Sequence, residues 1–291
     1  MNCFCTISTK SHAYKVNALR DCLANFGFRL LNLVIDETNS TLTNQQDYSI
    51  HQLTDELTGQ LVRKYTSSPD RLRWSLKPVF LKFLLNKGYE KVVYLDNDLY
   101  FFQSPQPLLD WLDQSCFLLT PHYYESNPEV SPNWFEANFR LGLFNAGLLG
   151  ATSAGIPILD WWGKACLYAI RKSMWRGLFD DQKYLDLVPV LFDKVYIIKD
   201  TGYNLGAWNV KNRIQTIGNP GVDKVVFVHF NDLTIREFSR TDHVFHSLWL
   251  KYHQALIQHN PGFVYRYRWF SSYAIFAFLY YCKWKFIRLF E

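Results

Sequence analysis

The chain has 291 residues, of which 48% are hydrophobic and 20% charged, so it has the length and composition of a folded protein with a sizeable core. Its net charge of +5 is concentrated in residues 263–291, which carry five basic residues and one acidic residue. Subtracting these from the totals of 31 and 26 leaves a body with 26 basic and 25 acidic residues. A nearly neutral body argues against nucleic-acid binding and indicates a local attachment surface at the C-terminal end.

The elements predicted in chain order alternate between strands and helices. In the first third we expect strands at 4–9, 30–35 and 92–95, helices at 11–25 and 75–86, and an irregular loop at 38–52. Ser75 is the expected N-cap of the second helix, with Pro78 in its first turn. Later we expect strands at 117–120, 144–150, 195–198 and 225–228, and helices at 108–112, 158–173 and from 180 onward. This alternation predicts one α/β domain, residues 1–262, with a mostly parallel sheet.

Six cysteines are scattered through the chain without a Cys-x-x-Cys pair. This pattern argues against a zinc site or a disulfide framework and favours a reducing, cytoplasmic compartment. Cys3 and Cys5 alternate within the first strand, so we expect them to be small core residues. The first ten residues lack a basic segment followed by a long apolar one, so we expect no signal peptide.

The chain contains one Asp-x-Asp sequence, at Asp96 and Asp98, directly after the apolar run 92–95. Alternate residues of an extended chain project to the same side, so the two carboxylates can converge on one point. A hard divalent cation would satisfy both, because unpaired carboxylates are costly to bury. About one such pair is expected by chance among 18 aspartates, and the alternative is an exposed turn with solvated side chains.

His229 also follows an apolar run, residues 225–228. A single histidine in such a place is more often a core or surface residue than a ligand. The ends of parallel strands, however, bring distant segments together at one edge of a sheet, so we expect His229 to join the aspartates. Two carboxylates and an imidazole suit Mn²⁺, or Mg²⁺ with added water.

Five ordered motifs resemble those of GT-A fold glycosyltransferases, especially family 8 and related bacterial nucleotide-sugar transferases. They are Lys77, Leu95–Asp98, Phe144–Gly147, Asp181–Gln182 and His229–Phe230, and the resemblance spans residue 1 to about residue 235. It implies a Rossmann-like fold and a metal-dependent hexosyltransferase that uses Mn²⁺ or Mg²⁺. The implied donor is a nucleotide sugar with uridine diphosphate, and the implied acceptor is a glycan or lipid-linked molecule. The implied pathway is cell-surface polysaccharide or lipopolysaccharide synthesis, with retention of configuration.

The resemblance also implies a role for individual residues. Asp96, Asp98 and His229 match the metal ligands, and Asp181 and Gln182 match a catalytic pair that faces the donor sugar. The implied donor-binding residues are Thr6, Ser8, Lys77, Asp96, Asn97, Asp98, Asn145, Ala146 and Gly147. Asn145 has the alternative role of a turn residue, and Asp181 that of an acid at a helix N-terminus. The stretch 203–209 is similar to one in bacterial members and faces the acceptor, unless its tryptophan is only a core residue.

One feature departs from the family pattern. A lysine that contacts phosphate commonly follows the histidine, whereas here only Arg236 could replace it. Two other classes of protein remain as alternatives. A phosphatase of the haloacid dehalogenase type also uses Asp-x-Asp, but after its first strand and not near residue 96. A catalytically inactive scaffold with the same fold would not need the complete ligand set.

The C-terminal tail, residues 263–291, has 13 aromatic residues interleaved with Arg and Lys. Its longest uncharged run, 269–282, has 14 residues and is too short to span a bilayer, which takes about 20. Aromatic residues flanked by basic ones are typical of a helix at an anionic membrane surface. We therefore expect a helical tail that attaches the protein to the inner face of the cell membrane. The alternatives are a helix packed on the body or a surface for a partner.

Overall fold

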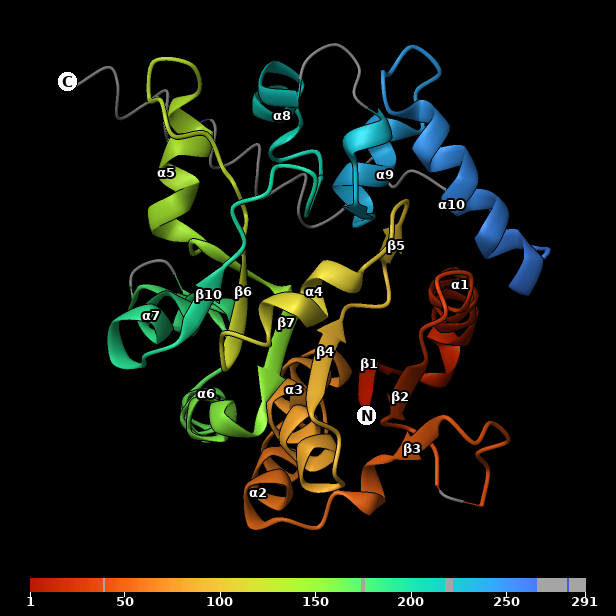
Figure 1. Cartoon of the computed structure of the whole chain (residues 1–291), viewed down its shortest axis with the longest axis vertical. Coiled ribbons are helices and arrows are strands. Elements are labelled where there is room, and N and C mark those ends of the chain that lie inside the picture. The colour runs from red at the N-terminus through yellow and green to blue at the C-terminus, as the bar shows by residue number, and fades with distance from the viewer. Residues whose placement is uncertain (39, 174–175, 218–221, 266–281, 283–291) are drawn as a thin grey trace.

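The computed structural model describes residues 1–265 and 282, except residues 39, 174–175 and 218–221. Seven strands form its central sheet in the order β10-β6-β7-β4-β1-β2-β3 (Figure 1). Their bounds are Asn2–Ser8 (β1), Leu30–Val34 (β2), Asp47–Ser49 (β3), Lys91–Leu95 (β4), Phe117–Pro121 (β6), Phe144–Thr152 (β7) and Val195–Ile197 (β10). Within this sheet only β7 runs antiparallel to its neighbours, β4 and β6. The prediction of a mostly parallel α/β sheet is confirmed.

Helices cover both faces of the sheet, because successive residues of each buried strand point to opposite sides. The helices are Ala13–Ala24 (α1), Glu56–Tyr65 (α2), Pro69–Asn86 (α3), Gln106–Trp111 (α4), Pro132–Arg140 (α5), Ile156–Tyr168 (α6), Val188–Leu191 (α7), Val210–Ile217 (α8), Asp232–Phe238 (α9) and His246–His259 (α10). Cys3 and Cys5 pack into the cluster that contains α2, α3 and α6 residues, as expected for small core residues. Phe4 packs on the other face, against α1 and α4.

Helix α3 begins six residues before the predicted start. Ser68 is its N-cap and Pro69 its first residue, so the start signal expected at 75–78 occurs already at 68–69. Ser75 and Pro78 lie inside the helix, where the Ser75 hydroxyl donates to the Leu72 carbonyl (2.8 Å). The six added residues lengthen the helix by fewer than two turns.

The strand that carries His229 is not part of the central sheet, which corrects our expectation of a parallel strand end. Strand β11, Phe227–His229, pairs antiparallel with β5, Leu99–Phe101, in a separate two-stranded sheet. In this ladder His229 lies opposite Leu99. Strand β5 follows the Asp-x-Asp motif directly, so the short ladder and not the main sheet brings the histidine to the aspartates. Helices α9 and α10 pack with β11 in a third apolar cluster.

Smaller differences concern the loops. The segment 38–52 contains strand β3 and a 3₁₀ helix at Ile50–Gln52, because the chain there extends the edge of the sheet. The helix predicted at 158–173 ends at Tyr168 and is followed by a short hairpin of β8, Lys172–Ser173, and β9, Leu178–Phe179. The element after Asp181 is a 3₁₀ helix, Gln182–Leu187.

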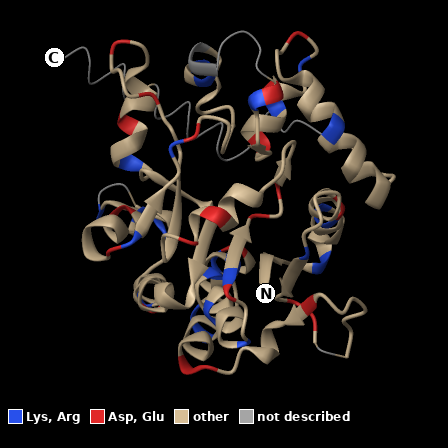
Figure 2. Cartoon of the chain, viewed as in Figure 1, with Lys and Arg blue, Asp and Glu red and all other residues tan. Residues whose placement is uncertain are grey.

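The predicted tail falls almost entirely outside the described residues, at 266–281 and 283–291. Among the helices that are described, none is long and apolar enough to cross a bilayer. Basic and acidic side chains are interspersed over the described elements (Figure 2), as the nearly neutral body predicts.

Candidate metal and donor site

Asp96, Asp98 and His229 converge at the carboxyl end of β4. One ligand atom from each lies within 4.8 Å of the others, and His229 Nε2 is 3.2 Å from Asp98 Oδ1. The main chain fixes this approach, since the Phe230 amide donates to the Asp98 carbonyl (2.8 Å). The aspartate side chains are partly exposed and the histidine is nearly buried. The three residues therefore form a preassembled oxygen and nitrogen set that opens to solvent.

The charges in this set depend on one another. Burial alone would raise the pKa of Asp98, but the adjacent His229 lowers that pKa well below its usual range. Burial alone would lower the pKa of His229, but the carboxylates of Asp98 and Asp96 outweigh it and raise that pKa. Two carboxylates that hold an imidazole so strongly would also attract a divalent cation to the same place.

Gly147 gives this set its space. It lies on β7 beside β4, and its carbonyl accepts from the Asp96 amide (2.7 Å). A Cβ at this position would lie 2.8 Å from His229 Cε1, 2.9 Å from Asn145 Oδ1 and 3.1 Å from Asp96 Oδ2. No side chain fits among these atoms without displacing them. The glycine at this position therefore makes room for the side chains of Asp96 and His229.

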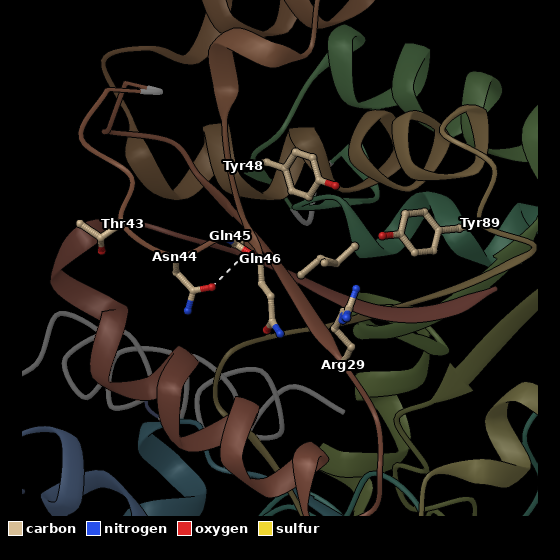
Figure 3. Close-up of a pocket in the computed structure, with 8 residues that line it drawn as sticks. Arg29, Thr43, Asn44, Gln45, Gln46, Tyr48 and Tyr89 are labelled. Atoms are coloured by element: carbon tan, nitrogen blue, oxygen red, sulfur yellow. Dashed lines mark hydrogen bonds between the residues drawn. The ribbon is translucent and has the colours of Figure 1, made fainter.

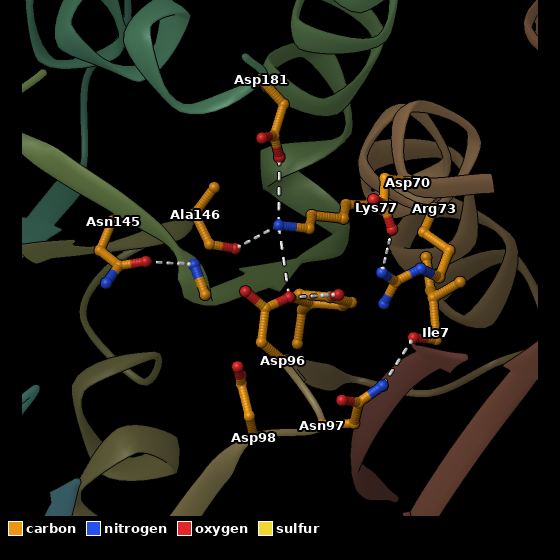
Figure 4. Close-up of polar contacts among 12 residues, drawn as sticks. Ile7, Asp70, Arg73, Lys77, Asp96, Asn97, Asp98, Asn145, Ala146 and Asp181 are labelled. Atoms are coloured by element: carbon orange, nitrogen blue, oxygen red, sulfur yellow. Dashed lines mark hydrogen bonds and ion pairs between the residues drawn. The ribbon is translucent and has the colours of Figure 1, made fainter. Parts of the chain in front are cut away.

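Lys77 is the buried cation at the centre of the site (Figure 4). Its Nζ lies 3.1 Å from Asp181 Oδ2, 3.4 Å from Asp96 Oδ1 and 3.0 Å from the Ala146 carbonyl. Burial alone would lower the pKa of Lys77, but the two carboxylates outweigh it and raise that pKa. Lys77 therefore stays charged and links Asp96, at the end of β4, to Asp181.

Asp181 and Gln182 occupy different surroundings despite being neighbours. The Asp181 carboxylate is buried against Lys77, and its carbonyl accepts from Trp162 Nε1 (3.0 Å). Burial raises the pKa of Asp181 to about 6, with Asp96 adding to the rise and Lys77 opposing it. Gln182 donates from its side-chain amide to the Leu141 carbonyl (2.9 Å). The structure thus brings Asp181 into the charged cluster and places Gln182 at its edge.

Asparagine side chains support His229 from behind. Asn145 Nδ2 lies 3.1 Å from His229 Nδ1 and 3.2 Å from Asn204 Oδ1, while Asn145 Oδ1 accepts from the Gly147 amide (2.7 Å). Asn204 in turn donates to the Pro121 carbonyl (2.9 Å). These contacts occupy Nδ1 and leave Nε2 as the histidine atom on the aspartate side. Such supporting contacts commonly orient metal ligands.

The remaining expected donor residues lie along β1. Thr6 and Ser8 are fully buried within the strand, and the Ser8 hydroxyl donates to Asn32 Oδ1 (3.0 Å). Asn97, between the two aspartates, reaches the Ile7 carbonyl at 3.5 Å and so ties the motif to the end of β1. Arg236, the proposed substitute for the missing lysine, is an exposed residue in the last turn of α9.

Sequence reasoning missed three residues of this site. Tyr94 donates from its hydroxyl to Asp96 Oδ1 (2.7 Å), and the alternation of the strand places it on the same side as Asp96. Asn204 lay in a stretch noted only for the acceptor. Trp208, from the same stretch, packs edge-on against His229 with ring centres 5.6 Å apart and donates to the His122 carbonyl (2.8 Å). Its structural role could not be separated from a ligand role by sequence.

The fold described above is the GT-A glycosyltransferase fold. The structure resembles the bifunctional glycosyltransferase WbbM with a TM-score of 0.51 and 10% identity, over 87% of this chain and 49% of that one. It resembles mouse xyloside xylosyltransferase 1 with a TM-score of 0.50 and 14% identity, over 80% of this chain and 99% of that one. The predicted GT-A architecture is confirmed.

Sequence comparison adds relatives without a described activity. The uncharacterized protein YfnF of Bacillus subtilis is 27% identical over 88% of this chain and 93% of its own length. The uncharacterized protein YfnD of the same organism is 26% identical over 80% of this chain. No protein-family model matches the sequence.

Proposed function

We propose that this protein is a metal-dependent glycosyltransferase that moves a hexose from a uridine diphosphate sugar to a glycan or lipid-linked acceptor. The observation that carries the proposal is the convergence of Asp96, Asp98 and His229 within 4.8 Å, beside the Lys77–Asp181 pair. Known glycosyltransferases share the fold, which supports the same class of reaction. The proposed setting is cell-surface polysaccharide or lipopolysaccharide synthesis, with retention of configuration.

The chemistry of the donor set fits a hard divalent cation. Asp96, Asp98 and His229 would hold Mn²⁺ or Mg²⁺, whose role is to offset the charge on the departing diphosphate. Gly147 keeps the space between these side chains free of any Cβ. This fit is the reason to expect that nucleotide-sugar binding requires the metal.

The other residues would act on the donor sugar. Lys77 holds the Asp181 carboxylate in place, and Asp181 would stabilise the positive charge that develops at the anomeric carbon. Gln182 carries an amide group that can bond a sugar hydroxyl once it leaves the Leu141 carbonyl, and Asn145 would hold His229 in its orientation at the donor site. Ala146 contributes its carbonyl to Lys77, and Thr6, Ser8 and Asn97 would shape the nucleoside end of the site.

Calorimetry with a panel of nucleotide sugars, with and without Mn²⁺, tests this function. We expect one uridine diphosphate sugar to bind only with metal, and Asp98→Asn to abolish that binding. Asp113→Asn is the matched control, because its carboxylate pairs with Lys91 at the surface. Failure of every nucleotide sugar to bind at any metal concentration would falsify the proposal. Release of phosphate from simple esters would instead indicate a phosphatase, and inactivity in both assays a scaffold.

We also propose that residues 263–291 attach the catalytic domain, residues 1–262, to an anionic membrane surface on its cytoplasmic side. The five basic and 13 aromatic residues of this tail support the proposal. A protein that ends at residue 265 should keep the cooperative urea unfolding of the catalytic domain and lose sedimentation with anionic vesicles. Equal sedimentation of both proteins, or equal binding to neutral vesicles, would contradict it.

A further inference from the structure

A second hollow lies at the opposite end of the sheet from the metal-binding residues. It is a pocket of about 690 Å³ between the start of β2, strand β3 and the turn before β4 (Figure 3). Arg29 directly precedes β2 and Tyr89 lies two residues before β4, whereas Asp96 follows the end of β4. Parallel strands therefore separate this pocket from the donor site, and a molecule bound here would not be the donor.

The lining of this pocket is polar. Leu31 is the one aliphatic residue among those that line it in the described chain, and the others include Arg29, Asn44, Gln46, Tyr48 and Tyr89. Arg29 is exposed and is the only charged residue of the lining, which contains no carboxylate. The pocket therefore suits a ligand with many hydrogen-bonding groups and one negative charge, and does not suit a cation.

Two tyrosines and Arg29 face the same space in this pocket (Figure 3). The Tyr48 ring packs edge-on against Phe80 and Phe83 of α3, with ring centres 6.0 and 5.6 Å apart. The hydroxyls of Tyr48 and Tyr89 point toward one another, with the Arg29 guanidinium beside them (Figure 3).

We propose that this pocket binds a carboxylate-bearing sugar unit of the acceptor glycan, away from the site of transfer. The guanidinium of Arg29 matches a carboxylate with two parallel hydrogen bonds, and its single charge balances one carboxylate. A nucleoside diphosphate would leave most of its charge unbalanced here. Sugar hydroxyls would bond the hydroxyls of Tyr48 and Tyr89.

Because it names the acceptor, this assignment rests on the proposed function. A glycan held at the pocket would raise the effective concentration of its other end near the donor.

The test is an NMR titration of the full chain with methyl β-D-glucuronide and methyl β-D-glucoside, which differ only in carboxylate against hydroxymethyl. We expect saturable binding of the glucuronide with shifts at the pocket, and binding of the glucoside at least about tenfold weaker. Arg29→Gln should remove the preference for the glucuronide, and Tyr48→Phe should weaken both ligands. Arg63→Gln, an exposed arginine outside the pocket, is the matched control and should change nothing.

The outcomes separate this inference from the proposed function. Asp98→Asn should abolish nucleotide-sugar binding and leave glucuronide binding intact. If no nucleotide sugar binds while the glucuronide shifts pocket residues, the pocket assignment stands and the transferase proposal fails. Equal binding of the two glycosides, no saturable binding, or an unchanged preference in Arg29→Gln would overturn the pocket assignment.

Discussion

Replacing Gly147 with alanine adds one methyl group at the most crowded point of the site. The new Cβ would lie 2.8 Å from His229 Cε1 and 2.9 Å from Asn145 Oδ1, so both distances are about 0.5–0.6 Å short of the 3.4 Å at which ordinary contact begins. Neither neighbour can yield freely, because His229 contacts Asp98 and Asn145 bonds the Gly147 amide. We therefore expect the imidazole to move away from the aspartates.

Overpacking of this kind costs about 1–3 kcal/mol of unfolding free energy, and displaced metal ligands lose about 10–100-fold in metal affinity. Gly150→Ala separates the two effects. Gly150 lies on the same strand, and its added Cβ would meet Leu118 Cδ1 at 2.8 Å and Leu112 Cδ1 at 3.1 Å, in the apolar core. Urea unfolding measures stability, and calorimetry with Mn²⁺ measures affinity for both variants.

We expect both glycine variants to lose stability and only Gly147→Ala to lose metal affinity. Wild-type Mn²⁺ affinity in a folded Gly147→Ala protein would refute the reasoning, because the ligand set would then tolerate the added carbon. An equal loss of affinity in Gly150→Ala would refute it too, since the effect would then come from general destabilisation.

Three further predictions concern the charged and amide groups around the ligand set. Lys77→Met should lower the unfolding free energy by about 3–5 kcal/mol in urea, because it leaves the buried Asp181 carboxylate without its cation; an unchanged midpoint would contradict this. The pKa of Asp181 is about 6 in the folded protein, against an ordinary value of 3.8. The unfolding free energy of the wild type should therefore fall as pH rises from about 4 to 6. Urea unfolding at several pH values should show a smaller fall in Asp181→Asn. Asn204→Gly can keep the left-handed backbone at this position (φ 56°) but removes the hydrogen bond to Asn145. Affinity for Mn²⁺ in calorimetry should therefore fall about 10-fold. Unchanged affinity would exclude a supporting role for Asn204.

Local sequence signals predicted the parts of the site that depend on single strands. The apolar run before Asp96 and Asp98 predicted β4, and the strand alternation placed both carboxylates on one side. Asn145 and Gly147 were expected at the donor site because the stretch Phe144–Gly147 resembles a glycosyltransferase motif. The cysteines of β1 were correctly predicted as core. In each case the deciding information lay within about ten residues of the chain.

What could not be predicted depends on long-range pairing. His229 was expected at the end of a parallel strand, but it reaches the aspartates through the β5–β11 ladder. The start of α3 was misplaced because two Ser and Pro start signals lie within ten residues, and packing of the earlier turns on α6 and α2 favours the longer helix. The asparagine contacts behind His229 join segments about 60 and 80 residues apart. No local pattern encodes them.

The β5–β11 ladder also has a consequence for the order of folding. His229 pairs with Leu99 across a loop of 130 residues, and closing a loop of that length costs about 4 kcal/mol of chain entropy. An ion bound by residues on both sides of the ladder would return about 2.7 kcal/mol at 100 times its dissociation constant. A ribosome-bound chain that ends before β11 has only the two carboxylates, so the complete ligand set forms late in synthesis. We therefore expect a bound divalent ion to hold β11, and with it α9 and α10, against the end of β4.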